Sequence, residues 1–373
     1  MYDNKIAIIE PVGGHGGMDF YNYGLALGLA KNKWNVHIFT SGETSERIYE
    51  NVSTHKTFKK VWSRKNKAIK LLYFLIEHLI SYRKAKRKGI SILHFHFFEL
   101  DLKNYLALKL AKRFKFKLVV TIHDVSSFQG VPASNFSVKI AAMADKIIVH
   151  NTVSAKEVIE LGLTNEPVII PHGNYLPFIE SVKGKDKNES SPLNILFFGQ
   201  IKEVKGLEIL LNALGEVKAD STFVKLTIAG KIWKDNPKKY EQLIQRLGID
   251  NMVECHYNYI PNEEVGSYFK NTDLVVLPYK KIYQSGVLLL SMSYGRPVLV
   301  SDLEAFTEII EDNENGFIFK QNSAEDLARK LEYICNNKEQ LDLVASNANQ
   351  LLVDKFDWIK IGVQTIEKVY SIL

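Results

Sequence analysis

At 373 residues, 46% of them hydrophobic, the chain is longer than one hydrophobic core normally supports, so two domains are expected. Its two cysteines, Cys255 and Cys335, exclude a disulfide framework and a cysteine zinc site, and are interpreted as core thiols. The net charge of +6 is concentrated, because twelve Lys or Arg residues and one acid lie between His55 and Lys88. This asymmetry indicates a local anionic partner.

The first half of the chain alternates short β-rich runs with amphipathic stretches, as in doubly wound α/β proteins. The β-rich runs predict strands at 5–10, 35–40, 91–95, 117–122, 146–150 and 168–171. The stretches at 20–31, 101–113 and 152–161 are long enough for crossover helices. A Rossmann-like domain is therefore predicted over 1–180, and the charged, Gly-, Ser- and Pro-containing segment 181–192 is predicted to be a linker.

The same alternation restarts after the linker. Strands are predicted at 193–198, 224–229, 252–255, 274–277, 298–300 and 316–319, which gives a second Rossmann-like domain over 193–355. Helical patterns at 324–336, 338–353 and 357–372 follow, and the last segment, 356–373, is expected to pack back on the first domain. Two such sheets facing a central cleft would direct the carboxyl ends of their strands into it, where doubly wound folds bind ligands.

A glycine-rich loop follows the first predicted strand. Gly13, Gly14, Gly16 and Gly17 allow close approach to a ligand, and a helix expected to begin near Asp19 offers free N–H groups to a phosphate or hydroxyl. The dinucleotide fingerprint Gly-x-Gly-x-x-Gly is not in good register, so a plain flexible loop is the alternative.

Histidines lie at the carboxyl ends of two predicted strands, where buried polar groups cost stability unless they have a use. His123 is the stronger functional candidate, with a structural hydrogen-bonding role as the alternative. For His94 and His96 the structural role is favoured. A zinc site formed by the three is a further alternative, disfavoured because no Asp or Glu has a familiar ligand spacing.

Cations also follow predicted strands in the second half. Lys202 and Lys205 come after a turn containing Gly199 and Gln200, and Lys231 ends the next strand. Together these lysines can neutralise a diphosphate, although a solvated surface position is the alternative for each.

The segment 277–302 predicts a strand, a loop, a helix that opens at Gly286, a stop at Gly295 and another strand. The helix start, flanked by Ser285 and Val287, is a candidate anion site for a β-phosphate.

The order of these motifs resembles the retaining glycosyltransferases of family 4, which have the GT-B fold. The family's Gly-x-x-x-x-x-Lys-Gly turn is matched in part by 199–206, and its Gly-(Lys/Arg)-Pro-Val strand entry by 295–298. Residues 170–173 resemble its Pro-(Asn/His)-Gly segment. The resemblance spans nearly the whole chain and implies an α/β protein of two Rossmann-like domains that binds a nucleotide sugar donor.

The chain departs from the family at the motif Glu-x7-Glu. Tyr283 stands where the first glutamate, implicated at the donor sugar, is usually found, and Ser291 stands at the second, implicated at the ribose. As a neutral group, Ser291 should hold a ribose hydroxyl more weakly. Gln200 stands where an arginine is common, and Lys202 is expected to supply the charge instead.

The resemblance implies sugar transfer, with retention of configuration, to a glycan or lipid-linked acceptor, and a role in bacterial surface polysaccharide synthesis. Lys202 and Lys205, with the amides near Gly286, would stabilise the departing diphosphate, and His123 would orient the acceptor or the sugar. Tyr257 is a candidate contact to the donor. Because no Asp-x-Asp occurs in the sequence, a metal-independent reaction without a cofactor is expected.

Two other functions remain open. A nucleotide-sugar epimerase of the same fold would need carboxylates in the cleft, and the neutral Tyr283 and Ser291 count against it. The same substitutions favour a catalytically silent partner subunit.

The basic stretch 56–88 encloses apolar residues at partly helical spacing, which suits an amphipathic helix on an anionic membrane leaflet. A solvated helix whose apolar side is core is the alternative. Nucleic acid is not predicted, because no recognition motif accompanies the charge. Since the N-terminus lacks a signal pattern and 71–80 is too short to span a bilayer, a cytoplasmic protein, peripheral to the inner face of the plasma membrane, is expected.

Overall fold

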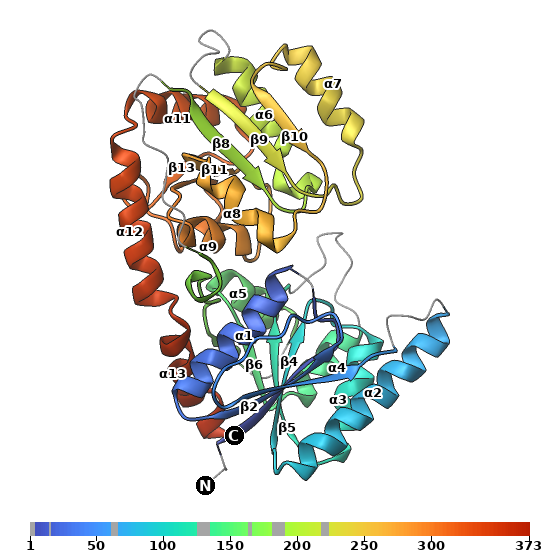
Figure 1. Cartoon of the computed structure of the whole chain (residues 1–373). Helices are drawn as coiled ribbons and strands as arrows, with labels where there is room; N and C mark the ends of the chain where they lie inside the picture. The colour runs from blue at the N-terminus through green and yellow to red at the C-terminus, as the bar shows by residue number, and fades with distance from the viewer. Residues whose placement is uncertain are drawn as a thin grey trace. The chain divides into compact units, whose positions relative to one another are not determined.

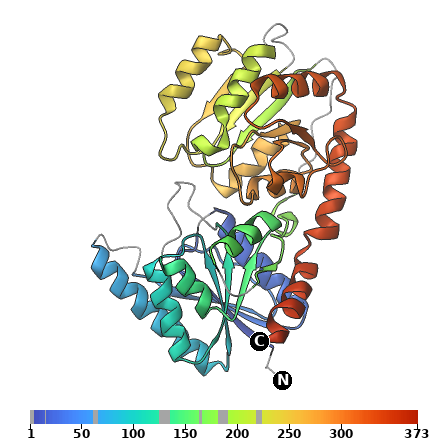
Figure 2. The same cartoon turned by 180° about the vertical axis from the view of Figure 1, so that it is seen from behind.

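The computed structural model describes residues 4–14, 16–60, 66–124, 135–162, 166–180, 191–217 and 224–373. The chain forms two compact units: unit 1 (Met1–Gly173 with Lys355–Leu373) and unit 2 (Asn174–Asp354). Figures 1 and 2 show them from opposite sides. Unit 2 thus begins ahead of the predicted linker, most of which, 181–190, lies outside the described residues.

Unit 1 contains a seven-stranded sheet in the order β3-β2-β1-β4-β5-β6-β7, with every neighbouring pair parallel. Its strands are β1 (Lys5–Glu10), β2 (Asn35–Ser41), β3 (Val52–Phe58), β4 (Ile92–Phe97), β5 (Lys117–Ile122), β6 (Lys146–Val149) and β7 (Val168–Ile169). Six of these were predicted and are confirmed. The sequence reasoning missed β3, because VSTHKTF lies at the sheet edge, only partly buried, and lacks an apolar run.

The helices of unit 1 are α1 (Gly16–Lys31), α2 (Lys67–Arg87), α3 (Leu102–Arg113), α4 (Asn135–Met143), α5 (Thr152–Glu160) and α13 (Trp358–Lys368), with a final 3-10 turn at Tyr370–Ile372. The expected start of α1 near Asp19 is wrong, since the helix begins at Gly16. Asp19 lies in the first turn, where its carboxylate accepts hydrogen bonds from the backbone N–H groups of Gly14 (3.0 Å) and Ser45 (3.1 Å).

The C-terminal helix α13 packs beside α1, as Figure 1 shows, which confirms the expected return of the chain end to the first domain. The contact is backbone to backbone. A Cβ atom added to Gly28 of α1 would lie 1.9 Å from the carbonyl oxygen of Trp358, so only glycine permits this approach.

The two faces of the unit 1 sheet differ in chemistry. On one face, alternate residues such as Ile9, Phe95, Val120 and Val149 join the apolar core beneath α2, α3 and α4. The residues between them point to the other face, because successive side chains of a strand alternate. That second face carries polar side chains at the carboxyl ends of its strands.

Unit 2 contains a six-stranded parallel sheet in the order β10-β9-β8-β11-β12-β13. Its strands are β8 (Leu193–Phe198), β9 (Val224–Ala229), β10 (Val253–His256), β11 (Leu274–Leu277), β12 (Val298–Ser301) and β13 (Phe317–Phe319). All six predicted strands are confirmed. The helices are α6 (Leu207–Glu216), α7 (Pro237–Leu247), α8 (Asn262–Lys270), α9 (Gly286–Ser293), α10 (Glu304–Thr307), α11 (Ala324–Asn336) and α12 (Gln340–Lys355), with 3-10 turns at Leu176–Phe178 and Glu203–Lys205.

Candidate functional site

The turn that follows β8 is held against the neighbouring strand ends of unit 2 by backbone contacts. A Cβ on Gly230 would lie 1.9 Å from the carbonyl oxygen of Gly199, and a Cβ on Gly206 would lie 2.0 Å from that of Pro278. Gly199 and Gly206 both have positive φ, 97° and 64°. Glycine is therefore required where 199–206 passes over the ends of β9 and β11.

The Gly199 turn brings Lys205 and the start of α9 together. A Cβ on Gly199 would lie 3.5 Å from the Nζ atom of Lys205 and 3.2 Å from Cγ2 of Val287. The ammonium group of Lys205 lies 5.1 Å from the ring centroid of Tyr279, within cation–π range. Among the described residues no carboxylate pairs with Lys205, so its charge remains available to an anion.

Helix α9 begins at Gly286, as predicted, and ends before Gly295, whose φ is 65°. The hydroxyl of Ser285 caps it by accepting a hydrogen bond from the N–H of Leu288 (3.2 Å). A Cβ on Gly286 would lie 2.9 Å from the hydroxyl of Tyr175. The first turn thus combines orphan N–H groups, the positive end of the helix dipole and a residue without a side chain.

The two positions that depart from the acidic motif are both buried. Tyr283 is enclosed, and the Nζ atom of Lys281 lies 5.3 Å from its ring centroid. The hydroxyl of Ser291 donates to the carbonyl of Val287 within α9 (2.7 Å). An interaction of Ser291 with a ribose would therefore use the lone pair of its oxygen, and this role stays a prediction.

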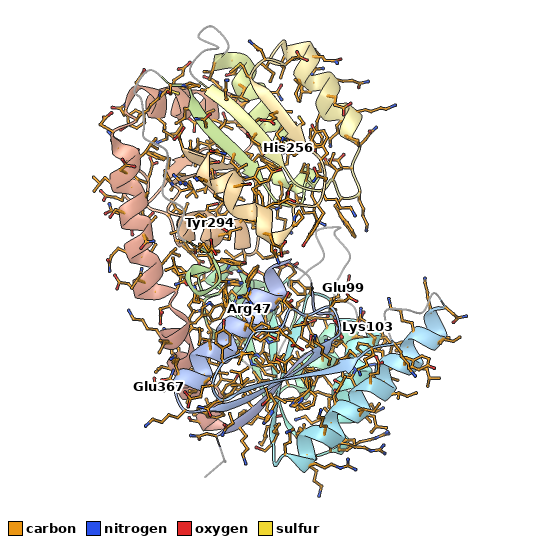
Figure 3. All side chains as sticks on the ribbon, viewed as in Figure 1. Arg47, Glu99, Lys103, His256, Tyr294 and Glu367 are labelled. Carbon is orange, nitrogen blue, oxygen red and sulfur yellow. The ribbon has the colours of Figure 1, made fainter. Side chains whose placement is uncertain are left out.

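The other predicted contacts of unit 2 lie around the same strand ends. Lys202 immediately precedes the 3-10 turn that carries Lys205. Gln200 and Lys231 are exposed, and Tyr257 is half-buried after β10. The preceding residue, His256, labelled in Figure 3, accepts the N–H of Gly230 at its backbone carbonyl (2.9 Å). The structure thus brings Gly199, Lys205, Gly286 and Val287 together and leaves Gln200 and Lys231 on the surface.

In unit 1, His123 lies at the end of β5 and is buried among other imidazoles. Its Nδ1 atom is 3.0 Å from Nε2 of His150, and its Nε2 atom is 3.2 Å from Nδ1 of His96. Phe98, 44% exposed, stacks on the His123 ring with 4.8 Å between ring centroids. Burial holds the pKa of His123 well below its usual value, so the ring is neutral.

His94 has a structural position. Its Nδ1 atom is 2.6 Å from the hydroxyl of Tyr370, and its Nε2 atom is 2.7 Å from Oγ1 of Thr121. These contacts tie the last turn of the chain to the unit 1 sheet. Among the residues the structure describes, no group of three or more His, Cys, Asp or Glu side chains is arranged to hold a metal ion.

Glu10 is a candidate functional residue that the sequence analysis did not identify. It ends β1, and its carboxylate accepts a hydrogen bond from the N–H of Val12 (2.9 Å). Burial, the largest cause, raises the pKa of Glu10 to about 7, although hydrogen bonds from the backbone of Val12 and Gly13 oppose the rise. The available signal was the one used for His123: a polar residue at the carboxyl end of an apolar strand. Gly16 and Gly17, predicted as donor contacts, form the start of α1.

Two sequence profiles match the chain. Residues 15–174 match the profile described as Glycosyltransferase Family 4, and residues 179–351 match that described as Glycosyl transferases group 1. The chain belongs to the GT-B glycosyltransferases of family 4. No helix among the described residues is long and apolar enough to span a membrane.

Individual relatives of this glycosyltransferase family are distant in sequence. An uncharacterised glycosyltransferase of Methanocaldococcus jannaschii is 23% identical, over 90% of this chain and 89% of the relative. Sucrose-phosphate synthase from Thermosynechococcus elongatus superposes with a TM-score of 0.76 at 18% identity, covering 99% of this chain and 98% of that one. HepE of Anabaena, solved in complex with UDP-glucose, has a TM-score of 0.71 at 16% identity, covering 98% and 99%. The likeness to these structures shows the shared fold.

Proposed function

We propose that the chain transfers a sugar, with retention of configuration, from a nucleotide diphosphate donor to a glycan or lipid-linked acceptor, in the synthesis of a bacterial surface polysaccharide. The reaction would proceed without a metal ion, at the inner face of the plasma membrane. Family membership supports the transferase activity, and the UDP-glucose complex of HepE supports a nucleotide sugar as donor.

One observation carries the donor assignment: the ammonium group of Lys205 and the first turn of α9 both lie against Gly199. A diphosphate placed there would accept hydrogen bonds from the N–H groups at Gly286 and Val287, and would be neutralised by Lys205. Charge that develops on the departing diphosphate would be stabilised by groups already in position. Lys202, next to this turn, would add a second cation.

A donor screen tests this function. The protein is incubated with UDP- and GDP-sugars without an acceptor and with EDTA, and release of the nucleoside diphosphate is measured. Thermal shifts with the same compounds report binding, which stabilises the folded state by mass action. Slow release with one donor supports a transferase. Binding without release, also after acceptor glycans are added, would instead identify a silent partner subunit.

Helix α2 has two apolar faces, which bears on the acceptor. One face, with Phe74, His78 and Tyr82, is buried against the unit 1 core. The other carries exposed aliphatic side chains at helical spacing: Ile69, Leu72, Ile76 and Ile80. At 100° per residue this stripe lies opposite the buried face. Helix α2 lies beside α3 at the edge of the helix layer (Figures 1 and 2).

Basic side chains accompany the exposed stripe. Arg83 and Arg87 are exposed on the same side near the end of α2, with Lys84 beside them, and Lys67 is exposed at the start of the helix on the opposite side. Exposed aliphatic groups between cations match an anionic bilayer surface, which accepts the apolar groups below its phosphates. A lipid-linked acceptor would be presented at that surface.

Replacing Leu72 by glutamate is expected to reduce binding to vesicles of 30% phosphatidylglycerol about tenfold. The change removes a 57%-exposed leucine from the bilayer and adds a charge that repels the lipid. Flotation of the full chain with these vesicles and with pure phosphatidylcholine measures it. Leu343→Glu is the matched control, because Leu343 is 64% exposed on α12. Equal binding of Leu72→Glu and wild type would remove the membrane assignment.

A further inference from the structure

A row of polar side chains crosses the unit 1 sheet, one from each of four adjacent strands. Register places Glu10 of β1 next to His96 of β4, because Ile9 pairs with Phe95. His96 pairs with Thr121 of β5, and His123 follows two residues after Thr121. Thr121 in turn pairs with Ile148 of β6, so His123 lies next to His150, which follows β6. The three imidazoles are joined directly by hydrogen bonds of 3.2 and 3.0 Å.

The end of the row at β7 fixes the direction of these hydrogen bonds. Nδ1 of His150 lies 3.0 Å from the carbonyl oxygen of Ile170, and a carbonyl can only accept. His150 therefore carries its proton on Nδ1, and its Nε2 accepts from Nδ1–H of His123. By the same reasoning, Nε2 of His123 accepts from Nδ1–H of His96, because a neutral imidazole has one donor and one acceptor nitrogen.

This leaves Nε2 of His96 as a bare acceptor. His96 is 4% exposed, and its Nε2 atom is buried without a hydrogen-bond partner among the described residues. Tyr21 of α1 packs edge-on against the row, with its ring centroid 5.0 Å from that of His96 and 4.8 Å from that of His123. A buried acceptor without a donor costs about 1–3 kcal/mol, so this lone pair calls for a donor that the described residues do not supply.

We infer that the three imidazoles of the row, those of His96, His123 and His150, form a one-directional hydrogen-bond chain whose open end, Nε2 of His96, accepts a hydrogen bond from a neutral sugar hydroxyl. The inference rests on the proposed function for the identity of the ligand. An anionic phosphate oxygen would face Nε2 acceptor to acceptor and is excluded. His123 and His150 are then positioning residues, because they hold His96 in the tautomer that leaves Nε2 unprotonated.

Nitrogen-15 NMR of the free, full-length protein tests the direction of the chain without any ligand. Two-bond ¹H–¹⁵N spectra distinguish protonated from bare imidazole nitrogens. We expect His96, His123 and His150 all to be protonated at Nδ1, although the Nε2–H tautomer is the commoner one in water. A proton on Nε2 of any of the three overturns the inference.

Titration with methyl α-D-glucopyranoside and methyl α-D-mannopyranoside tests the ligand class. At least one glycoside should shift the Nε2 resonance of His96, while sulfate, an anion without a hydroxyl donor, should not. No shift with either glycoside, or an equal shift with sulfate, overturns the ligand assignment. Neither result depends on turnover, so a failed donor screen and a failed His96 assignment remain distinguishable.

Two variants separate the open end from the rest of the row. His96→Asn keeps a donor near the Nδ1 position but has no atom at Nε2, so glycoside binding should weaken about 3- to 10-fold, the usual loss for one neutral hydrogen bond. His96→Gln keeps an acceptor near Nε2 and should restore most of the affinity. His37→Asn, at a half-buried histidine of β2, is the matched control. Equal affinity for the wild type and His96→Asn contradicts the assignment.

Discussion

Replacing Lys205 by methionine is expected to lower the rate of nucleoside diphosphate release at least about 100-fold, the loss typical of removing one preorganised group that stabilises developing charge. The Nζ atom of Lys205 lies at the Gly199 turn beside the first turn of α9, where we propose that the diphosphate binds. Methionine preserves the apolar stem of the side chain over Tyr279 but removes the cation. Transition-state charge on the leaving group would then lack its nearest counter-ion.

The measurement is kcat for nucleoside diphosphate release with the donor found in the screen, together with the Kd of the nucleoside diphosphate itself. Because the product carries much of the charge of the transition state, its Kd should also rise. Lys238→Met, at an exposed lysine of α7, is the matched control and should leave both values within twofold. An unchanged rate in Lys205→Met would remove the phosphate site from this turn.

The fold could be predicted from the sequence because its signals are local. Apolar runs such as 193–198 and 274–277 are buried central strands, and Gly295 stops α9 by adopting a left-handed conformation. These signals need no knowledge of neighbouring elements. The start of α1 was misplaced because two glycines, poor helix formers by propensity, occupy its first turn.

The candidate site was predictable only in part. Lys205 could be chosen because it follows a strand–glycine turn, yet its approach to Val287 depends on how the turn packs across β11. The histidine row was harder to predict from the sequence, because His96, His123 and His150 are far apart in the chain and come together only through the strand order. The tautomer of His123 follows from the hydrogen bond between His150 and the carbonyl of Ile170, and no sequence pattern predicts that hydrogen bond.

Acid is expected to unfold unit 1 with a midpoint at about pH 5, because its buried histidines are neutral in the folded state. Burial is the main cause that lowers the pKa of each of these groups: His78, His94, His96, His123, His150 and His172. For His78 and His150 the folded pKa is about 4, against 6.5 unperturbed. The unfolded chain therefore binds more protons as pH falls below 6.5, and stability falls in that window.

The expected size of this effect exceeds the opposing one. Each buried histidine costs up to about 1.4 kcal/mol per pH unit below 6.5, so six cost up to about 8 kcal/mol per unit, against a typical stability of about 5–15 kcal/mol. Glu10 acts oppositely: its folded pKa of about 7 lies above its ordinary value of 4.5, so stability rises by about 3 kcal/mol at most as pH falls between these values.

Urea unfolding at pH 7.5, 6.5 and 5.5, followed by fluorescence of the buried Trp34 and Trp358 of unit 1, measures the dependence. The free energy of unfolding should fall modestly between the first two values and steeply to the third. His78→Leu removes one of the six groups without touching the row, so its stability should decline less steeply with acid, by about one proton. A stability that stays flat down to pH 5 would mean that these imidazoles remain protonatable in the folded chain. That outcome would also exclude the one-directional pattern inferred for His96, His123 and His150, because the pattern requires neutral rings.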